Sequence, residues 1–342
     1  MLDLIAPDWA SGAWDLVGPA LPRFCAILAL SFAARIAWSV GIISFAPIAI
    51  AAIAGYCAAN LLVAGAGVAL ALLAAGIIGF WLGLLAAMLL GRLPAHAQTL
   101  ATLVMAVLIG PVSRVVPAWT GGADGIDISA LSPPTGETTA LVSLALLAVI
   151  IVACSALDRT WFAIAARALR HSHALASSMG IQPTSIRTIG FGLSGLLAGL
   201  GGALLVMGTG VASPGTFPLS LAFLAVAATL LGGAYHWAGP ILGSLIFALP
   251  AAMQGAATPG LLDIANAVAV IVLLIFLPRG LLDPRDSLRR ESRERRRQSL
   301  ASSHAPPPVD APRRRSSSRH GQQSDHASRL SSAIKRRTGT PR

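Results

Sequence analysis

The chain has few charged residues for its length. Only 11% of its 342 residues are Asp, Glu, Lys or Arg, whereas 55% are hydrophobic, and the mean hydropathy is +0.73. A soluble globular domain carries about 25% charged residues, which cover its surface. The shortage of charge excludes a water-soluble globule and predicts an all-α, polytopic membrane protein.

Residues that build catalytic or metal sites are scarce as well. The three cysteines, Cys25, Cys57 and Cys154, lie in apolar stretches without CxxC spacing, so we expect neither a disulfide framework nor a zinc site. The sequence contains no GxSxG, HExxH or Walker A motif, and no apolar segment carries a carboxylate pair. We therefore expect no catalytic residue, no metal and no cofactor, and a chain that is not an enzyme.

The positive charge is confined to the C-terminal part of the chain. Residues 279–342 hold 17 of the 25 basic residues and six of the 14 acidic ones, whereas the first 278 residues are electrically balanced. The isoelectric point near 11.3 thus comes from a tail, and we expect no nucleic-acid partner. Because residues 283–342 are rich in Ser, Arg and Pro, we expect a disordered basic cytoplasmic tail.

Nine apolar segments approach or exceed the roughly 20 residues that a helix needs to cross a bilayer. We expect helices because a helix bonds its own backbone groups, which have no water to bond in lipid. Pro47 and Pro111 predict a kinked or broken helix in the second and fourth segments. The segments lie at about 21–40, 42–63, 67–90, 97–117, 138–157, 188–209, 217–233, 238–256 and 261–277.

The arginines predict how these nine helices are oriented, because cytoplasmic loops are enriched in basic residues. The loop at 158–187 carries four arginines and one acid, whereas the loop at 118–137 carries three acids and no basic residue. We therefore place the first loop and the C-terminus in the cytoplasm, and the N-terminal segment 1–20 in the periplasm. Arg35 and Arg114 lie within apolar segments, and we expect both to extend to the lipid headgroups.

Glycines form two clusters. The first recurs at three- and four-residue spacing on one helical stripe, which predicts close packing of helix backbones; it comprises Gly192, Gly195, Gly199 and Gly202. The second, at 232–240, combines a Gly-Gly pair, an aromatic pair and Gly-Pro between two apolar segments. Two interpretations remain open for it: a discontinuous helix that lines a substrate site, or a turn at the membrane interface with aromatic anchors.

Several short motifs occur in an order that resembles a known family, the LivM-type permease subunits of branched-chain amino-acid ABC importers. The resemblance covers about residues 25–282. The motifs are Gly41–Ser44 with Ala54-Gly55-Tyr56, Thr102-Leu103 with Thr120–Gly125, Arg167–Arg170 through Gly180-Ile181, Phe191–Gly202, Gly232–Gly243, and Pro278–Leu281.

This resemblance implies a binding-protein-dependent permease of the bacterial inner membrane, with a transmembrane domain at 21–282. The implied partners are a second permease subunit, two ATP-binding ABC subunits, a periplasmic solute-binding protein and the lipid bilayer. ATP hydrolysis would occur on the partner subunits. The loop at 158–187 would couple to them through Arg167, Arg170 and Gly180.

The implied solute is a branched-chain or other small amino acid. We expect the pathway to include Ser44, Tyr56, Gly232, Gly233 and Trp237. The same machinery could carry urea, an amide or a sugar instead. A secondary transporter or channel is a less favoured alternative, because it would need an intramembrane acid and only Asp263 is a candidate. A non-transporting scaffold that recruits partners through its basic tail is the third alternative.

Overall fold

The computed structural model describes residues 21–252, with gaps at 92, 130–135, 172, 179 and 235, and residue 268. Its helices are α2 (Leu21–Ser39), α3 (Ala46–Val63), α4 (Val68–Leu90), α5 (Ala95–Val115), α6 (Pro117–Thr120), α7 (Gly136–Leu157), α8 (Trp161–His171), α9 (His173–Ser178), α10 (Pro183–Thr209), α11 (Leu219–Gly232) and α12 (Gly239–Ala252). A 3₁₀ turn, η1 (Pro214–Thr216), and two short strands, β1 (Ile126–Asp127) and β2 (Val211–Ala212), complete these elements.

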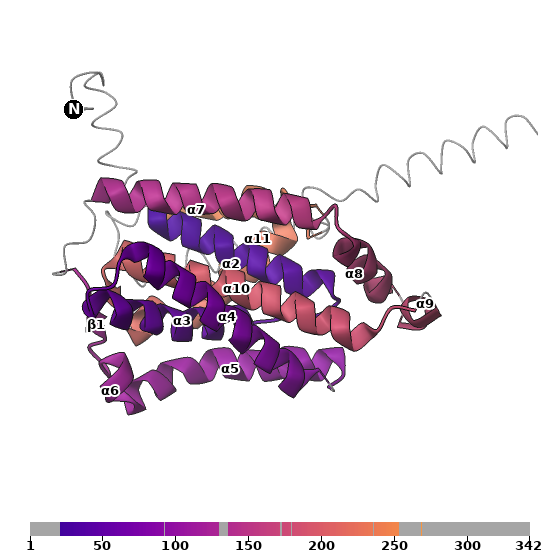
Figure 1. Cartoon of the computed structure of the whole chain (residues 1–342), viewed down its shortest axis with the longest axis horizontal. Coiled ribbons are helices and arrows are strands. Elements are labelled where there is room, and N and C mark those ends of the chain that lie inside the picture. The colour runs from indigo at the N-terminus through magenta and orange to yellow at the C-terminus, as the bar shows by residue number, and fades with distance from the viewer. Residues whose placement is uncertain are drawn as a thin grey trace, which may run out of the picture. The chain divides into compact units, whose positions relative to one another are not determined.

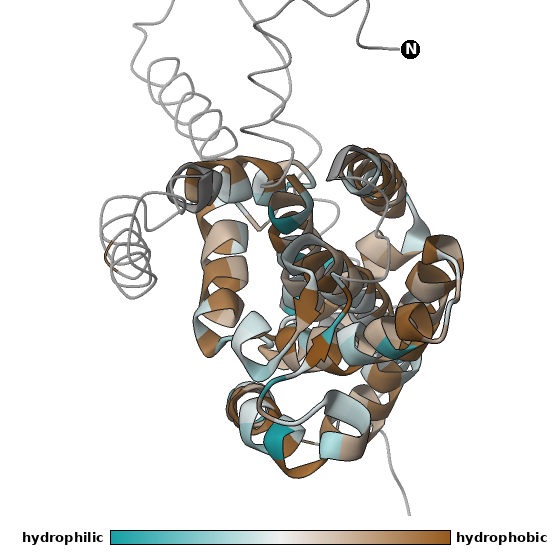
Figure 2. Cartoon of the chain, turned by 90° about the vertical axis from the view of Figure 1, so that its left-hand side faces the viewer, coloured by the Kyte–Doolittle hydropathy of each residue, from teal (hydrophilic) through white to brown (hydrophobic). Residues whose placement is uncertain are grey.

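Seven helical spans in the described part of the chain are long and apolar enough to cross a membrane; the seventh, Pro214–Gly232, comprises η1 and α11. They match the first seven predicted segments. Hydrophobic residues, drawn in brown in Figure 2, make up much of their length. α12 falls within the eighth segment. The ninth segment lies outside the described residues except for residue 268, as do residues 1–20 and 283–342. The count of nine crossings and the disordered tail therefore stay predictions.

The centre of the bundle is formed by α10, which packs against α2, α3 and α4 (Figure 1). Serine and threonine hydroxyl groups of other helices form hydrogen bonds with α2. The Ser194 Oγ of α10 donates to the Ala33 carbonyl at 2.8 Å, and the Thr229 Oγ1 of α11 donates to the Ser31 carbonyl at 2.8 Å. The Ser244 Oγ of α12 lies 3.2 Å from the Ser31 Oγ. Such interhelical hydrogen bonds add to van der Waals packing where lipid provides no hydrophobic drive.

The glycine stripe of α10 brings helix backbones into contact, as its spacing predicts. A Cβ added at Gly195 or Gly199 would overlap backbone atoms of α4, and one added at Gly79 of α4 would overlap the Gly195 carbonyl. Gly202 faces a different neighbour, because a Cβ there would overlap the Ala51 carbonyl of α3. One stripe thus lets α10 approach two helices, and the prediction of close packing is confirmed.

The second predicted segment, 42–63, is helical only from Ala46. α2 ends at Ser39, the chain then runs without helix to Phe45, and Pro47 lies in the first turn of α3. A proline fits this position because the first turn has no internal partner for its N–H. The expected interruption thus precedes Pro47, whereas α5 continues through Pro111 without a break.

Two opposite ends of the bundle carry different elements (Figure 1). At the strand end, β1 pairs with β2 in antiparallel register, Ile126 opposite Ala212. The Ser129 hydroxyl and amide both donate to the Asp127 carboxylate there, which lowers the pKa of Asp127. At the other end, called here the α8 end, lie α8 and α9. The pairing of β1 with β2 joins the loop that follows α6 to the end of α10.

Replacing Gly195 by alanine tests the close packing of α10 on α4. We expect Gly195→Ala to lower the free energy of unfolding by about 1–3 kcal/mol, because the new methyl group must push two backbones apart. Gly110→Ala on α5 is the control, since a Cβ there meets nothing within 4 Å. Thermal unfolding of the purified chain in detergent should show a lower Tm for Gly195→Ala alone. Equal Tm values for the two variants would contradict this packing.

Candidate functional site

The five predicted pathway residues lie in two separate places. Ser44 and Tyr56 are buried on the segment before α3 and on α3 itself. Gly232, Gly233 and Trp237 lie at the end of α11 and in the turn that leads to α12. The first two residues therefore lie on α3 and the segment before it, twelve positions apart along the chain, and the other three lie between α11 and α12.

The turn between α11 and α12 is tight. A Cβ added at Gly232 would overlap the Gly239 backbone, and Gly233 has a φ of +106°, which favours glycine. Trp237 is half-buried, and its ring centroid lies 5.7 Å from that of His236. The glycines here hold α11 close to α12, and the exposed His236 and the half-buried Trp237 stand beside them.

A polar seam joins α5 to α3 and to the segment before it. One face of α5 buries Gln98, Thr102 and Ser113, although most of that helix is exposed. The Ser113 side chain lies near the Tyr56 hydroxyl, but it donates to the Gly110 carbonyl, and the Tyr56 hydroxyl has no hydrogen-bond partner among the described residues. We call Ser44, Tyr56, Gln98, Thr102 and Ser113 the α3–α5 seam. Sequence reasoning missed the three α5 residues as pathway candidates, although their spacing places these polar side chains on one face of an apolar helix.

The backbone of the segment before α3 is bonded within the protein. The Phe45 N–H donates to the Thr102 Oγ1 at 3.2 Å, and the Ala46 N–H donates to the Ser44 Oγ at 3.2 Å. The Ile48 N–H donates to the Phe45 carbonyl at 3.4 Å, and Pro47 has no N–H. The amino end of α3 therefore has its first donors satisfied inside the bundle.

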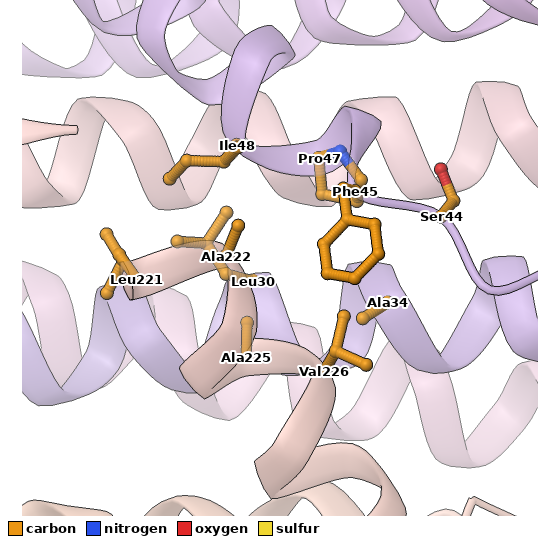
Figure 3. Close-up of a pocket in the computed structure, with 10 residues that line it drawn as sticks. All are labelled: Leu30, Ala34, Ser44, Phe45, Pro47, Ile48, Leu221, Ala222, Ala225 and Val226. Carbon is orange, nitrogen blue, oxygen red and sulfur yellow. The ribbon is translucent and has the colours of Figure 1, made fainter. Parts of the chain in front are cut away.

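A small pocket lies between this segment, α2 and α11 (Figure 3). Its cavity volume is only about 10 Å³, room for about one water molecule and far below the roughly 300 Å³ of a small ligand pocket. The Phe45 ring points into the gap toward α2 and α11 (Figure 3) and meets the Phe223 ring edge-on, with centroids 5.1 Å apart. Ser44 supplies the one hydroxyl among its lining side chains. In this conformation the pocket is closed to anything of solute size.

The predicted coupling loop contains two helices, α8 and α9. α8 is amphipathic: its inner face buries Phe162, Ala166 and Leu169 against the ends of α2, α4 and α10. Its outer face leaves Trp161 62% and Ile164 54% exposed. Arg167 is exposed on the same helix. An exposed apolar stripe beside a cation is typical of a surface that binds another protein.

The other two predicted coupling residues have different settings. Arg170 is half-buried, and its Cα lies 3.8 Å from the position that a Cβ on Gly41 would occupy. Gly41 has a φ of +88°. Gly180 follows α9 with a φ of +74°, and its N–H donates to the Ser177 carbonyl at 3.0 Å. Gly180 thus ends α9 as a left-handed cap, whereas Arg170 contacts the segment that leads to the pocket.

The prediction that Arg35 extends to the lipid headgroups is wrong. Arg35 is buried on α2 and forms an ion pair with Asp158, the first residue after α7. The Asp158 side chain is 27% exposed, so the pair lies at the edge of the bundle. A carboxylate close by satisfies a guanidinium more strongly than a distant headgroup does. The pair fixes the end of α2 to the start of the loop that carries α8.

Removing the acid of this pair tests its role. We expect Asp158→Asn to lower the free energy of unfolding by about 2 kcal/mol, because it leaves a buried guanidinium without its counter-ion; the partial exposure of Asp158 reduces the effect. The double variant Arg35→Met with Asp158→Asn should recover most of the loss, since it buries no charge. Thermal unfolding in detergent measures both. A double variant less stable than Asp158→Asn would refute this account.

The described interior contains little charge. Within the described ranges, no group of three His, Cys, Asp or Glu side chains comes together to hold a metal ion. Arg35 is the one buried charged side chain in the part of the chain that the structure describes. The interior there is therefore polar mainly through hydroxyl and amide groups.

Comparison with known proteins gives two matches. A family model described as the permease component of branched-chain amino acid transport systems matches residues 23–277. The nucleoside ABC transporter permease protein NupC of Lactococcus lactis subsp. cremoris (strain MG1363) is 29% identical over 164 residues, which cover 44% of this chain and 50% of that protein. The match thus spans about half the length of this curated relative. No solved structure matches the chain.

Proposed function

The chain belongs to the permease family of branched-chain amino acid transport systems, and we propose that it is the membrane-spanning subunit of an ATP-driven importer of small polar solutes. The observation that carries this proposal is the outer face of α8, where exposed Trp161 and Ile164 lie beside Arg167. We assign this face to the ATP-binding partner. The chain itself would be a non-catalytic subunit.

The contacts of α8 suggest how ATP hydrolysis could reach the pathway. The inner face of α8 packs on Val40 and Ile42, and Arg170 lies against Gly41. Four residues after Gly41 comes Phe45, whose ring points into the pocket (Figure 3). A displacement of α8 would therefore move the segment that positions Phe45. The outward-open and inward-open states must differ in their affinity for the solute for this movement to drive transport.

The remaining partners and the location follow from the family. We propose a second permease subunit, two ATP-binding subunits and a periplasmic solute-binding protein, assembled in a bacterial inner membrane. The N-terminus would be periplasmic, and the α8 end and the C-terminus cytoplasmic. The basic loop at 158–187 and the acidic loop at 118–137 support this orientation.

Two solute classes have support. The family description favours a branched-chain or other small amino acid, whereas the NupC similarity favours a nucleoside. An ion-coupled secondary transporter has less support, because the family model that matches residues 23–277 describes a permease component of branched-chain amino acid transport systems; its candidate coupling acid, Asp263, lies outside the described residues. We therefore propose ATP-driven uptake of a solute from one of these two classes.

Charge reversal at the coupling loop tests the ATPase contact. We expect Arg167→Glu together with Arg170→Glu to abolish solute-stimulated ATPase activity in the reconstituted complex, because the cations would be replaced by charges that repel the partner's surface. Arg167→Glu alone should reduce stimulation about tenfold, since Arg167 is exposed and its loss leaves the fold intact.

Arg114→Glu is the matched control, because Arg114 is an exposed arginine in the last turn of α5. It should leave stimulation unchanged. Normal stimulation in the double variant, with normal amounts of complex, would defeat the assignment of this loop.

The apolar part of the same face can be tested separately. We expect Ile164→Asp to weaken capture of the ATP-binding subunit about tenfold, since it places an unpaired carboxylate in the centre of the contact. Capture of the partner on immobilised permease measures this. Ala123→Asp, at an exposed site in the turn after α6, is the control; equal losses in both variants would indicate a general defect and contradict a specific contact.

A further inference from the structure

The ion pair of Arg35 with Asp158 connects α2 to the loop that carries α8, across 123 positions of the sequence. Asp158 directly follows α7, and only two residues separate it from the start of α8. This linker is hydrogen-bonded at both of its ends. The Thr160 N–H donates to the Leu157 carbonyl at 3.0 Å, and the Ala163 N–H of α8 donates to the Thr160 carbonyl at 3.2 Å. A displacement of α8 therefore acts on Asp158 through a short, bonded connection.

The arginine of this pair lies beside one wall of the pocket. Arg35 follows Ala34, which lines the pocket together with Leu30 of the same helix (Figure 3). The Ser31 carbonyl of α2 accepts a hydrogen bond from the Thr229 hydroxyl of α11 at 2.8 Å, and α11 supplies other lining residues. This wall is therefore made of two helices that are bonded to each other, and a pull on Arg35 acts on both.

α8 contacts the opposite wall of the same pocket through other side chains. Phe45 forms part of that wall, and its ring points toward α2 and α11 (Figure 3). The inner face of α8 packs on Val40 and Ile42, which lie on the same non-helical segment as Phe45. The loop therefore holds both walls, α2 by the ion pair and the Phe45 segment by apolar packing.

An ion pair fixes the position of α2 more strictly than an apolar contact could. Replacing a buried ion pair by apolar residues of similar volume often leaves a protein equally stable, because burying charge costs free energy. Stability alone is therefore a weak reason for an arginine here, whereas a fixed register between two segments is a better one. The guanidinium N–H of Arg35 is directed at a carboxylate oxygen of Asp158, whereas apolar attraction has no direction.

We infer that Arg35 and Asp158 are positioning residues for transport: their ion pair makes the end of α2 follow the loop that carries α8, so that a movement of the ATP-binding partner reaches both walls of the pocket. Neither side chain contacts the solute in this role. The inference rests on the proposed transport function and adds to it a second connection from α8 to the interior, through α2.

The test compares the wild type, Asp158→Asn and the double variant Arg35→Met with Asp158→Asn, each as the full chain reconstituted with its partner subunits in proteoliposomes. Uptake of radiolabelled leucine and of radiolabelled uridine is measured together with ATP hydrolysis. We expect both variants to move about tenfold less solute per ATP hydrolysed than the wild type. Capture of the ATP-binding subunit should not change, because the outer face of α8 keeps Trp161, Ile164 and Arg167.

Stability separates positioning from a structural role. The double variant buries no unpaired charge, so we expect its Tm to return toward that of the wild type while the solute moved per ATP stays low. A double variant with both quantities at the wild-type level would overturn the inference, because the pair would then serve stability alone. Asp124→Asn is the matched control, since Asp124 is an exposed acid at the strand end; it should leave both quantities unchanged.

A conservative variant keeps the inference testable if the double variant does not fold. Asp158→Glu retains a carboxylate for Arg35, so it should move more solute per ATP than Asp158→Asn does. Equal losses in these two single variants would contradict a role for the ion pair.

Failure of the proposed function has a different signature in the same experiment. A wild-type complex whose uptake of leucine and uridine does not depend on ATP would contradict ATP-driven transport of these solutes, and this inference with it. A wild-type complex with ATP-dependent uptake that the double variant reproduces would contradict the inference alone.

Discussion

Every backbone N–H and carbonyl in a bilayer must find its partner inside the protein, and the rest of this structure depends on that constraint. Helices meet it by themselves, but the segment between α2 and α3 is not helical and is largely buried. Donors at its end and in the first turn of α3 are met by Thr102, by Ser44 and by a neighbouring carbonyl. Two hydroxyls of the α3–α5 seam, those of Thr102 and Ser44, thus bond the backbone of this non-helical segment and the start of α3.

Close packing is the second consequence of the lipid environment. Because apolar burial gives helices no reason to associate in lipid, their association relies on contact between backbones and on hydroxyl hydrogen bonds. Gly195 and Gly199 allow the first on α10, and Ser194 and Thr229 provide the second toward α2. This frame holds α2 and α10 firmly, and the contacts of α8 connect it to the outer face that we assign to the ATPase.

Much of the architecture could be predicted from residue order alone. Length and apolarity predict the seven long helices that the described part of the structure contains, because both properties act locally along each helix. Glycine spacing predicts the packing stripe for the same reason. The mistaken elements involve contacts between distant segments: residues 42–45, predicted to begin the second helix, are not helical and bond to α5, and Arg35 pairs with an acid 123 positions away.

The sequence by itself determined that the chain spans a membrane, which of its loops is basic and which family it resembles, because hydropathy, charge and motif order are properties of residues along the chain. Only the tertiary structure decided that Ser44 and Tyr56 share a seam with Gln98 while Gly232 and Trp237 do not. An apolar segment can turn any face toward its neighbours, and the packing of α5 on α3 selects which polar side chains point inward.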